Sequence, residues 1–507
     1  MEKSQLIEEL RLILGAEKVL TDEEAVLEAG KDYIGFRIYE RTDGKNFAPR
    51  AACVVKPANT EEVSKVMKFL NENKIDAVPR TGGSSVTQSI EPVPGGVIID
   101  GSAMNEILKI DEINMTVTVR CGTPLEYLEN VLNEKGYSAG HFPQSLPMAH
   151  IGGLVATRSI GQFSTLYGGI EDLVVGLEAV LADGEIIRVK NVPRRSCGPD
   201  LRHLFIGSEG MLGFITEVTV KIFKYRPEER WLQAYAVKDM QTGLDMIRAI
   251  MSDGYKPAVV RLHDTAEVQL LLKLEDAVPP EHALLMFIAD GPASVAKATG
   301  AAIEEYAAQF GVTGLGEKPV LSWLKTRNDE CYHMERRGYH AMGLVVDTCE
   351  ISAEWSEIGG VYSAVIKRLS EEIEYLAYAG GHASHSYMQG TNIYFTFAFL
   401  ARNVELVKDD YMRVVGVILE ETLKRGGSIA HHHGSGKYRT SWMPREHGTS
   451  YPLLYKLKDA LDPNHILNKG VLLSEVSLRE TSAETCPKAG RFQNAPPDFF
   501  RVQVDKE

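Results

Sequence analysis

The sequence is poor in cysteine, and no two cysteines are spaced to hold a metal or a cluster. The six cysteines among 507 residues are Cys53, Cys121, Cys197, Cys331, Cys349 and Cys486. Without a CxxC pair, the sequence offers no zinc ribbon and no iron–sulfur centre. Scattered cysteines are typical of reduced, buried thiols, so we predict a cytoplasmic protein.

Long uncharged apolar runs are also lacking. A helix that crosses a bilayer needs about 20 apolar residues, and no stretch of this length occurs. The opening residues MEKSQLIEELRLILG form neither a transit pattern nor a cleavable signal, and the closing residues VQVDKE are no peroxisomal address. We therefore expect no transmembrane segment, while peripheral contact with a membrane stays open.

Positive charge is in deficit, because the formal net charge is −14. A protein that wraps a nucleic acid or binds an anionic bilayer needs a basic surface, so we expect no nucleic-acid partner. An acidic chain can still hold a local basic pocket. An anionic small molecule therefore remains a possible substrate.

The chain is too long for one hydrophobic core and reads as α+β throughout. Residues 50–225 mix β-branched strands with amphipathic helices, and from residue 226 strands alternate with longer helices. The Asp183-Gly184 pair predicts a hairpin turn. We divide the chain into an N-terminal helical segment (1–45), a first α+β domain (46–225), a second α+β domain (226–425), a C-terminal segment with three histidines (426–479) and a tail (480–507).

Glycine clusters are what the first domain has in abundance. PRTGGSSVTQS (79–89) follows a strand, and consecutive glycines let backbone N–H groups point at an anion such as a pyrophosphate. Alone this stretch predicts only a turn, but HIGGLVATRSIGQFSTLYGG, CGPDLRHLF and GSEGMLGFIT follow it. No GxGxxG lies between a strand and a helix, and His431 replaces the first glycine that a P-loop ending in GSGK would need. A dinucleotide would therefore lie in an extended, strand-rich cleft.

The order of these motifs resembles the FAD-binding domain of the vanillyl-alcohol oxidase / p-cresol methylhydroxylase (PCMH) family over residues 45–225. The resemblance implies a two-subdomain PCMH-type FAD-binding domain and a cap domain with an antiparallel sheet and a helical C-terminal segment that returns to the FAD domain. Members with covalent flavin often carry histidine in the glycine loop, where this chain has Ser84 and Ser85, so we expect non-covalent FAD. The cofactor residues that the resemblance implies are Pro79, Arg80, Thr81, Gly82, Gly83, Ser84, Ser85, Gln144, Ser145, His150, Gly152, Gly153, Thr157, Arg158, Ser159, Ile160, Glu209, Gly210, Leu212, Gly213 and Ile215.

Three consecutive histidines stand in GGSIAHHHGSGK (426–437). From the residues alone they suit a solvated surface, a metal site or a general base. Side chains of neighbouring residues on an extended segment point in opposite directions, so three in a row rarely meet one ion. Tyr394, in the strand-like stretch SHSYMQGTNIYFTFAF, could present its hydroxyl to a cleft or be a buried aromatic.

The second half of the chain resembles the alkyldihydroxyacetonephosphate synthase branch of the same family. GGSIAHHHGSGKYR, NIYFTFAF, EISAEW and PAVVRLHD carry this resemblance, which covers about residues 50–475. It implies an exchange of an acyl group for an alcohol through a flavin N5 adduct, as in ether lipid synthesis, on a homodimer. The implied catalytic residues are His431, His432 (the base), His433 and Tyr394. Arg336 or Arg337, with Arg261, would bind an anionic headgroup of a substrate with an acyl or alkyl chain, and no metal is implied.

An FAD-dependent dehydrogenase or oxidase of a 2-hydroxy acid or an alcohol is the alternative. Such enzymes carry GHxGDGNxH and EHGxG segments, whose histidine and glutamate bind a divalent metal. Tyr394 and His432 stand at the corresponding places here, which weakens a site for a hard ion and leaves one for a softer ion open. A non-catalytic flavoprotein subunit is a third possibility, without a cysteine cluster to support it.

Overall fold

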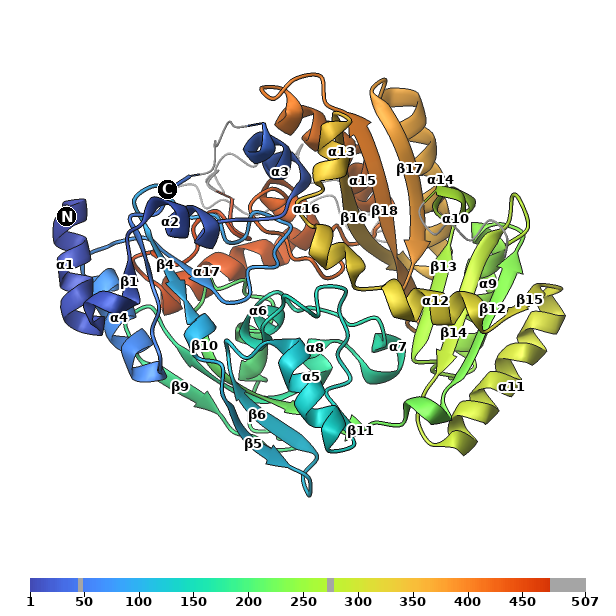
Figure 1. Ribbon diagram of the computed structural model, residues 1–507, viewed down its shortest axis with the longest axis horizontal. Helices are drawn as coiled ribbons and strands as arrows, with labels where there is room; N and C mark the ends of the chain where they lie inside the picture. Colours follow the sequence, from blue (N-terminus) through green and yellow to red (C-terminus); the bar gives the residue numbers. More distant parts are fainter. Residues whose placement is uncertain (44–48, 271–277, 475–507) are drawn as a thin grey trace.

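The computed structural model describes residues 1–43, 49–270 and 278–474 (Figure 1). The first lobe contains a four-stranded sheet in which β2, β4 and β3 are parallel neighbours and β1 is antiparallel to β2. Helix α1 buries Leu6, Leu10 and Leu14 against this lobe, as its apolar spacing predicts. The bounds are α1 (Lys3–Leu14), β1 (Val19–Leu20), α2 (Glu23–Ala29), α3 (Gly35–Thr42), β2 (Cys53–Val55), α4 (Thr60–Glu72), β3 (Ala77–Arg80) and β4 (Val97–Asp100).

The second lobe is an antiparallel five-stranded sheet in the order β5-β6-β10-β8-β9. The predicted hairpin joins β8 to β9, with Gly184 at a φ of +89°. Val180 of β8 and Phe214 of β10 reach the core under α4, so the two lobes share hydrophobic packing. The bounds are β5 (Ile107–Asp111), β6 (Thr116–Arg120), α5 (Leu125–Glu134), β7 (Tyr137–Ser138), α6 (Ile151–Ala156), α7 (Ser164–Tyr167), α8 (Ile170–Leu173), β8 (Val174–Val180), β9 (Ile186–Val189), β10 (Phe214–Lys221) and β11 (Phe223–Lys224).

The second domain is built on one antiparallel sheet of seven strands in the order β15-β12-β14-β13-β17-β18-β16. Helices α9, α11, α14 and α15 pack on one face (Figure 1). The bounds are β12 (Trp231–Val237), α9 (Met240–Ser252), β13 (Val259–His263), α10 (Thr265–Leu270), β14 (Ala283–Ala289), α11 (Ala293–Phe310), β15 (Thr313–Gly316), α12 (Lys318–Thr326), α13 (Arg337–Ala341), β16 (Leu344–Glu354), α14 (Trp355–Glu372), β17 (Leu376–Ala383), β18 (Gly390–Leu400) and α15 (Val407–Lys424).

The opposite face of this sheet turns toward the first domain. Alternate residues of β14, such as Met286 and Ile288, pack there with Trp323 of α12 and with Phe142 and Phe163 of the first domain. Because side chains alternate along a strand, every second residue of β13, β17, β18 and β16 also faces this side. The candidate site lies on this face.

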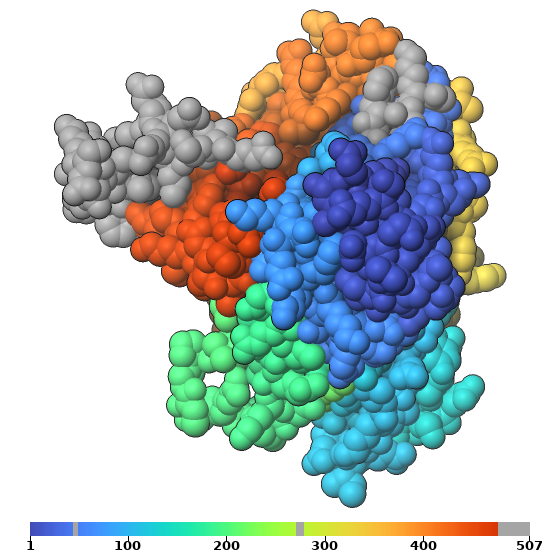
Figure 2. Space-filling model, turned by 90° about the vertical axis from the view of Figure 1, so that its left-hand side faces the viewer, coloured from blue at the N-terminus to red at the C-terminus, as the bar shows by residue number. Residues whose placement is uncertain are grey.

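After α15 the chain returns to the first domain through α16 (Met443–His447) and α17 (Tyr451–Leu461). The backbone N–H of Lys437 donates to the Thr87 carbonyl (3.0 Å), and Ala77 of β3 forms a bridge with Leu467. Figure 2 shows the orange-red surface of this segment beside the blue surface of the N-terminal residues. The segment thus carries the histidines from the second domain back to the first.

The structure can be compared with four predictions from the sequence: the fold class, the burial of the cysteines, the absence of a transmembrane segment and the tail. The α+β class and the antiparallel sheet of the second domain are confirmed. Cys53, Cys121 and Cys349 are buried free thiols, but Cys197 is exposed, so burial does not hold for every cysteine. None of the described helices is both long and apolar enough to cross a membrane. The predicted tail, residues 480–507 with Cys486, lies outside the described residues.

Candidate active site

Four polar side chains form one row across four neighbouring strands. His263 of β13 pairs with His382 of β17, His382 pairs with Tyr394 of β18, and Tyr394 pairs with Glu350 of β16. The flanking residues of each strand, such as Leu262 and Phe395, belong to the core under the helices, so the row points to the opposite face. Sheet register therefore assembles residues from distant parts of the sequence, such as His263 and Tyr394.

Glu350 anchors the histidine triplet through the backbone. Its carboxylate accepts the N–H groups of His432 (3.3 Å) and His433 (3.0 Å) and forms a two-point ion pair with Arg439 (3.1 and 2.8 Å). Glu350 and Arg439 are both completely buried. Burial alone would raise the pKa of Glu350, but Arg439 and His433 hold this pKa well below its usual range. Glu350 is therefore a carboxylate that fixes the triplet in place.

Each histidine of the triplet is hydrogen-bonded, and the Tyr394 hydroxyl contacts two of them, His432 Nε2 and, at 3.3 Å, His433 Nε2. His433 Nδ1 lies 2.9 Å from Glu350, and His432 Nε2 is hydrogen-bonded to the Tyr394 hydroxyl. His431 Nε2 lies 2.8 Å from the Tyr387 hydroxyl, and the Nδ1 atoms of His431 and His432 are 2.7 Å apart. Burial lowers the pKa of His431 to about 4 and holds that of His432 well below its ordinary value. His431 and His432 are thus neutral at physiological pH.

A fourth histidine, His385, joins the triplet from a loop that the sequence pattern misses. The stretch 384–399 is not one strand, because Ser384 to Gln389 form a turn before β18 begins. Asn392 fixes this turn by accepting the N–H groups of Ser384 and His385. The His385 ring stacks on His431 with centroids 5.2 Å apart, and its Nδ1 is hydrogen-bonded to Ser164 (2.8 Å).

The segment of the triplet is bent, and this brings two of its imidazoles together. His385, His431 and His432 each offer one nitrogen, and these atoms lie within 4.8 Å of one another. The sequence-based expectation that neighbouring histidines diverge assumes an extended segment, which is not what forms. Three neutral imidazoles are a ligand set for zinc or a similar ion.

Arg261 projects from β13 beside the row. Its Nε donates to His263 Nε2 (2.8 Å) and its Nη2 to His382 Nε2 (3.0 Å). The Nδ1 atoms of both histidines are hydrogen-bonded to the buried carboxylate of Glu267 (2.6 and 2.9 Å). Burial lowers the pKa of Arg261, and the guanidinium forms no ion pair within the described part of the chain. It is a fixed cation whose direct partners are neutral.

The two other candidate arginines lie in a different setting. Arg336 forms an ion pair with Asp347 (3.3 Å) and donates to the Val346 carbonyl, so its polar contacts are with β16. Arg337 is exposed at the start of α13. The structure therefore brings Arg261 to the row of polar residues and ties Arg336 to the strand backbone.

The predicted cofactor residues come from three loops that meet. A Cβ atom on Gly82 would lie 2.4 Å from the Met148 carbonyl oxygen, and one on Gly210 would lie 2.9 Å from Pro79. Glu209, at a φ of +48°, donates its N–H to Ala156 and accepts from the N–H groups of Ser435 and Gly436. Such left-handed residues are costly and concentrate at ligand-binding sites.

Unpartnered polar atoms at these loops fit a large polar cofactor. Within the described chain, His141 Nδ1, His150 Nδ1, Ser435 Oγ and Asn468 Oδ1 are buried without a hydrogen-bond partner. Burial lowers the pKa of His150 to about 4, which keeps its ring neutral. Unsatisfied buried groups cost free energy and call for a ligand. FAD, with its ribose, phosphates and ring amides, supplies partners for such atoms.

The sequence did not single out Glu350, Arg439, His263, His382, His385 or Glu267. The signal that could have found some of them is alternation. In VVRLH (259–263) the polar residues Arg261 and His263 interrupt an apolar strand at every second position, which places both on one face. Glu350, between Cys349 and Ile351, has the same pattern.

Comparisons with known proteins show the family to which the chain belongs. A family model described as an FAD binding domain matches residues 51–190, and one described as the C-terminal domain of FAD linked oxidases matches 226–472. The chain is 44% identical to the uncharacterized FAD-linked oxidoreductase YgcU of Escherichia coli (strain K12), over 93% of this chain and 99% of that protein. It is 30% identical to alkyldihydroxyacetonephosphate synthase of Caenorhabditis elegans, over 83% of this chain and 75% of that protein.

Solved structures show the fold. A structure of alkyldihydroxyacetonephosphate synthase superposes with a TM-score of 0.76 at 23% identity, covering 92% of this chain and 85% of that one. Substrate-bound p-cresol methylhydroxylase gives a TM-score of 0.72 at 17% identity, covering 93% and 97%. The PCMH-type fold is thereby confirmed, and the family models together with the FAD-linked relative confirm FAD as the cofactor.

Proposed function

The chain belongs to the FAD-linked oxidoreductases, and from this premise we propose that it oxidises a hydroxyl group on an anionic small molecule, such as a 2-hydroxy acid. The observation that carries this proposal is the meeting of Arg261, Tyr394 and His432 on one face of the second-domain sheet. These residues offer a cation for the anionic group and a proton acceptor for the hydroxyl. The match to the FAD linked oxidases supports an oxidative reaction.

Arg261 binds the carboxylate or phosphate of the substrate. Its guanidinium is held by two imidazole nitrogens and not by a carboxylate, so its charge is available to an incoming anion. A guanidinium meets a carboxylate or phosphate through two parallel hydrogen bonds. Glu267, Thr396 and the two histidines hold it in one orientation, which limits the entropy lost on binding.

Tyr394 and His432 act together on the hydroxyl. Tyr394 receives the hydroxyl proton as it passes its own proton to His432 Nε2, with which it is hydrogen-bonded. Burial depresses the pKa of His432, so the ring is neutral and keeps a lone pair that can receive this proton; because the charged ring is disfavoured there, the proton must be passed on. Burial raises the pKa of Tyr394, so the phenol stays protonated until the transfer occurs.

FAD binds in the three loops of the first domain, and Glu209 links these loops to the segment of the triplet. Bound FAD supplies an acceptor for the hydride that leaves the carbinol carbon. The loop near the pyrophosphate carries Ser84 and Ser85 and no histidine, so we propose that the cofactor is held without a covalent bond.

A second candidate is the exchange of an acyl group for an alcohol on an acyl-dihydroxyacetone phosphate. The contact between Tyr394 and His432 favours it, because these are the two residues that the resemblance to the synthase branch assigns to catalysis. Arg261 would then bind the phosphate. This reaction has no net redox change, which separates it from the first.

Anaerobic mixing distinguishes the two reactions. The yellow protein is mixed with a panel of 2-hydroxy acids and secondary alcohols, and separately with an acyl-dihydroxyacetone phosphate and a fatty alcohol. Lasting loss of the visible flavin band with a hydroxy compound supports oxidation. Release of fatty acid with the flavin returned to its oxidised spectrum, and no bleaching by any hydroxy compound, would overturn it in favour of the exchange.

A further inference from the structure

A continuous chain of hydrogen bonds leads from Tyr394 toward the surface. The Tyr394 hydroxyl is bonded to His432 Nε2, His432 Nδ1 lies 2.7 Å from His431 Nδ1, and His431 Nε2 lies 2.8 Å from the Tyr387 hydroxyl. Both nitrogens of each imidazole are therefore used, one toward the site and one away from it. An imidazole bonded on both sides can receive a proton on one nitrogen and release another from the opposite nitrogen.

The protons of Tyr394, His432, His431 and Tyr387 can be placed so that each hydrogen bond between them has one donor and one acceptor. His431 and His432 are neutral, so each ring carries one N–H and one lone pair. With Tyr394 donating to His432, His432 Nδ1–H donates to His431 Nδ1 and His431 Nε2–H donates to Tyr387. Every link then has one donor and one acceptor, and a reversal of all links moves one proton along the whole chain.

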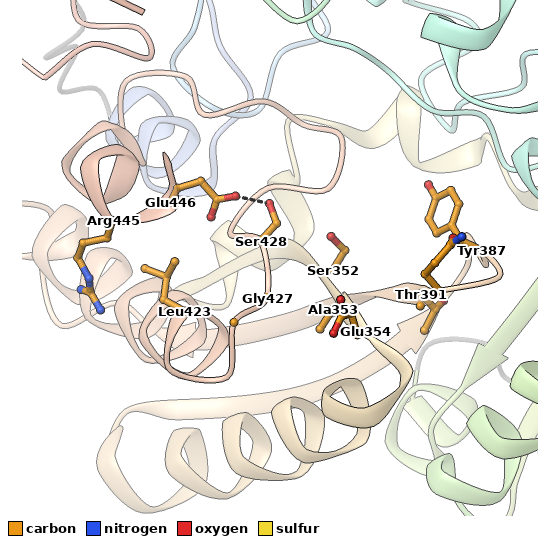
Figure 3. A pocket seen from close by; sticks show the side chains of 13 residues that line it. Ser352, Ala353, Glu354, Tyr387, Thr391, Leu423, Gly427, Ser428, Arg445 and Glu446 are labelled. Atoms are coloured by element: carbon orange, nitrogen blue, oxygen red, sulfur yellow. Dashed lines mark hydrogen bonds between the residues drawn. The ribbon is translucent and has the colours of Figure 1, made fainter. Parts of the chain in front are cut away.

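Tyr387 forms the outer end. It is 38% exposed and lines a pocket of about 440 Å³ between the ends of β16 and β18, the loop after α15 and α16. Figure 3 shows Tyr387 and Thr391 at one end of this pocket and Leu423 and Arg445 at the other. Trp355 holds the backbone of the Tyr387 loop by donating to the Tyr387 and Met388 carbonyls (3.2 and 3.1 Å). Tyr387 is the only exposed residue of the four in this chain of hydrogen bonds, so it is the one that can meet water.

The same imidazoles suggest a metal, but the distance between them favours a hydrogen bond. Two nitrogens bound to a tetrahedral zinc ion at 2.0–2.1 Å lie about 3.3 Å apart. The Nδ1 atoms of His431 and His432 are 2.7 Å apart, which is an ordinary hydrogen-bond length. His385 contributes a stacked ring whose Nδ1 is bonded to Ser164, and it is not a link of the chain.

We propose that His431 and Tyr387 form an exit path for protons, which carries the proton of the substrate hydroxyl from Tyr394 and His432 to water in the pocket. This inference rests on the proposed oxidation. In that oxidation the carbinol C–H bond would break and the C=O bond would form, bound FAD would supply the acceptor for the hydride, and the hydroxyl proton would remain for the protein to carry away. One proton enters this series of hydrogen bonds at Tyr394 and one leaves at Tyr387, so the charge of the four residues is unchanged by the transfer.

The test compares Tyr387→Phe and His431→Ala with the wild-type holoprotein. Tyr387→Phe keeps the ring and removes only the hydroxyl, and His431→Ala leaves room for free imidazole. We expect both variants to lower kcat about tenfold in dilute buffer, with KM unchanged. This loss is smaller than for a residue that takes the proton directly, because water partly replaces the missing side chain. Concentrated small buffers, and imidazole for His431→Ala, restore the rate. Tyr255→Phe, at a tyrosine 37% exposed elsewhere, is the control and keeps the wild-type rate.

A readout without turnover accompanies the kinetics. In protein with ¹⁵N-labelled histidine, long-range ¹⁵N–¹H spectra report the tautomer of each ring, and Tyr387→Phe should shift His431 more than it shifts His447. If substrate bleaches the wild-type protein and both variants turn over at the wild-type rate at every buffer concentration, the exit path is refuted. The proposed oxidation would still stand. Tight binding of Zn²⁺ that His431→Ala abolishes would also overturn the exit path. If no substrate bleaches the wild-type protein, the proposed oxidation is wrong. In that case, histidine tautomers that stay unchanged in Tyr387→Phe would also refute the chain of hydrogen bonds.

Discussion

Glu350→Gln is the change that most sharply tests how the histidine triplet is held. The side chains of Glu350 and Arg439 are both 0% exposed and are joined by two hydrogen bonds of 3.1 and 2.8 Å. Glutamine has the same shape and can still accept an N–H from the triplet, but it leaves the Arg439 charge without a partner. Removing one member of a buried ion pair costs about 3–5 kcal/mol, so we expect a loss of this size in the free energy of unfolding.

Urea unfolding at pH 7, followed by tryptophan fluorescence, measures this loss. The matched control is Glu371→Gln, because Glu371 pairs with Lys367 at the surface, with side chains 62% and 70% exposed. We expect less than about 1 kcal/mol for the control. The double change Glu350→Gln with Arg439→Met removes both charges and should recover part of the stability. A Glu350→Gln protein as stable as the control variant would refute the claim that this ion pair holds the triplet.

Three further predictions follow from the site. Arg261→Gln should raise KM for an anionic substrate about 10- to 100-fold, since a hydrogen bond to a charged group contributes about 1.5–3 kcal/mol, and should leave KM for a neutral alcohol unchanged in steady-state assays. Gly82→Ala should abolish FAD retention, because its Cβ would meet the Met148 carbonyl oxygen at 2.4 Å. The control Gly338→Ala has open space around the new Cβ and should keep the yellow colour. Equal flavin content in the two purified variants would contradict the close approach at Gly82. The rate of flavin reduction should stay level as pH falls through about 6.5, because burial lowers the pKa of His431 to about 4 and holds that of His432 well below its ordinary value, so both stay neutral there. A fall in rate centred near pH 6.5 in stopped-flow traces would show that these histidines titrate normally.

Local sequence patterns predicted the α+β class and the glycine-rich loops of the first domain. The β-branched strands, the Asp183-Gly184 turn and the amphipathic first helix are local signals, and each forms where the pattern placed it. The glycine loops follow the same logic, because a glycine such as Gly82 is needed where two loop backbones approach closely. Motif order then identified the cofactor.

Local alternation can place Glu350 on one face of its strand, but it cannot show which residues this carboxylate contacts. Glu350 and His382 become neighbours of Tyr394 only through strand register, and Arg439 reaches Glu350 only after the chain has returned from α15. His385 and Tyr387 were hidden because the sequence from 384 to 389 looks like part of a strand, whereas Asn392 folds it into a turn. Contacts of this kind depend on packing between segments that no local pattern connects.

The central claim is that Tyr394 and His432 remove the hydroxyl proton of a substrate beside FAD. The most direct measurement is anaerobic stopped-flow reduction of wild-type protein and His432→Ala, both loaded with FAD, by a hydroxy acid that bleaches the wild type. We expect the variant to keep its FAD and to be reduced at least about 100-fold more slowly, the lower end of what a general base contributes. Reduction of the variant at the wild-type rate would contradict the account.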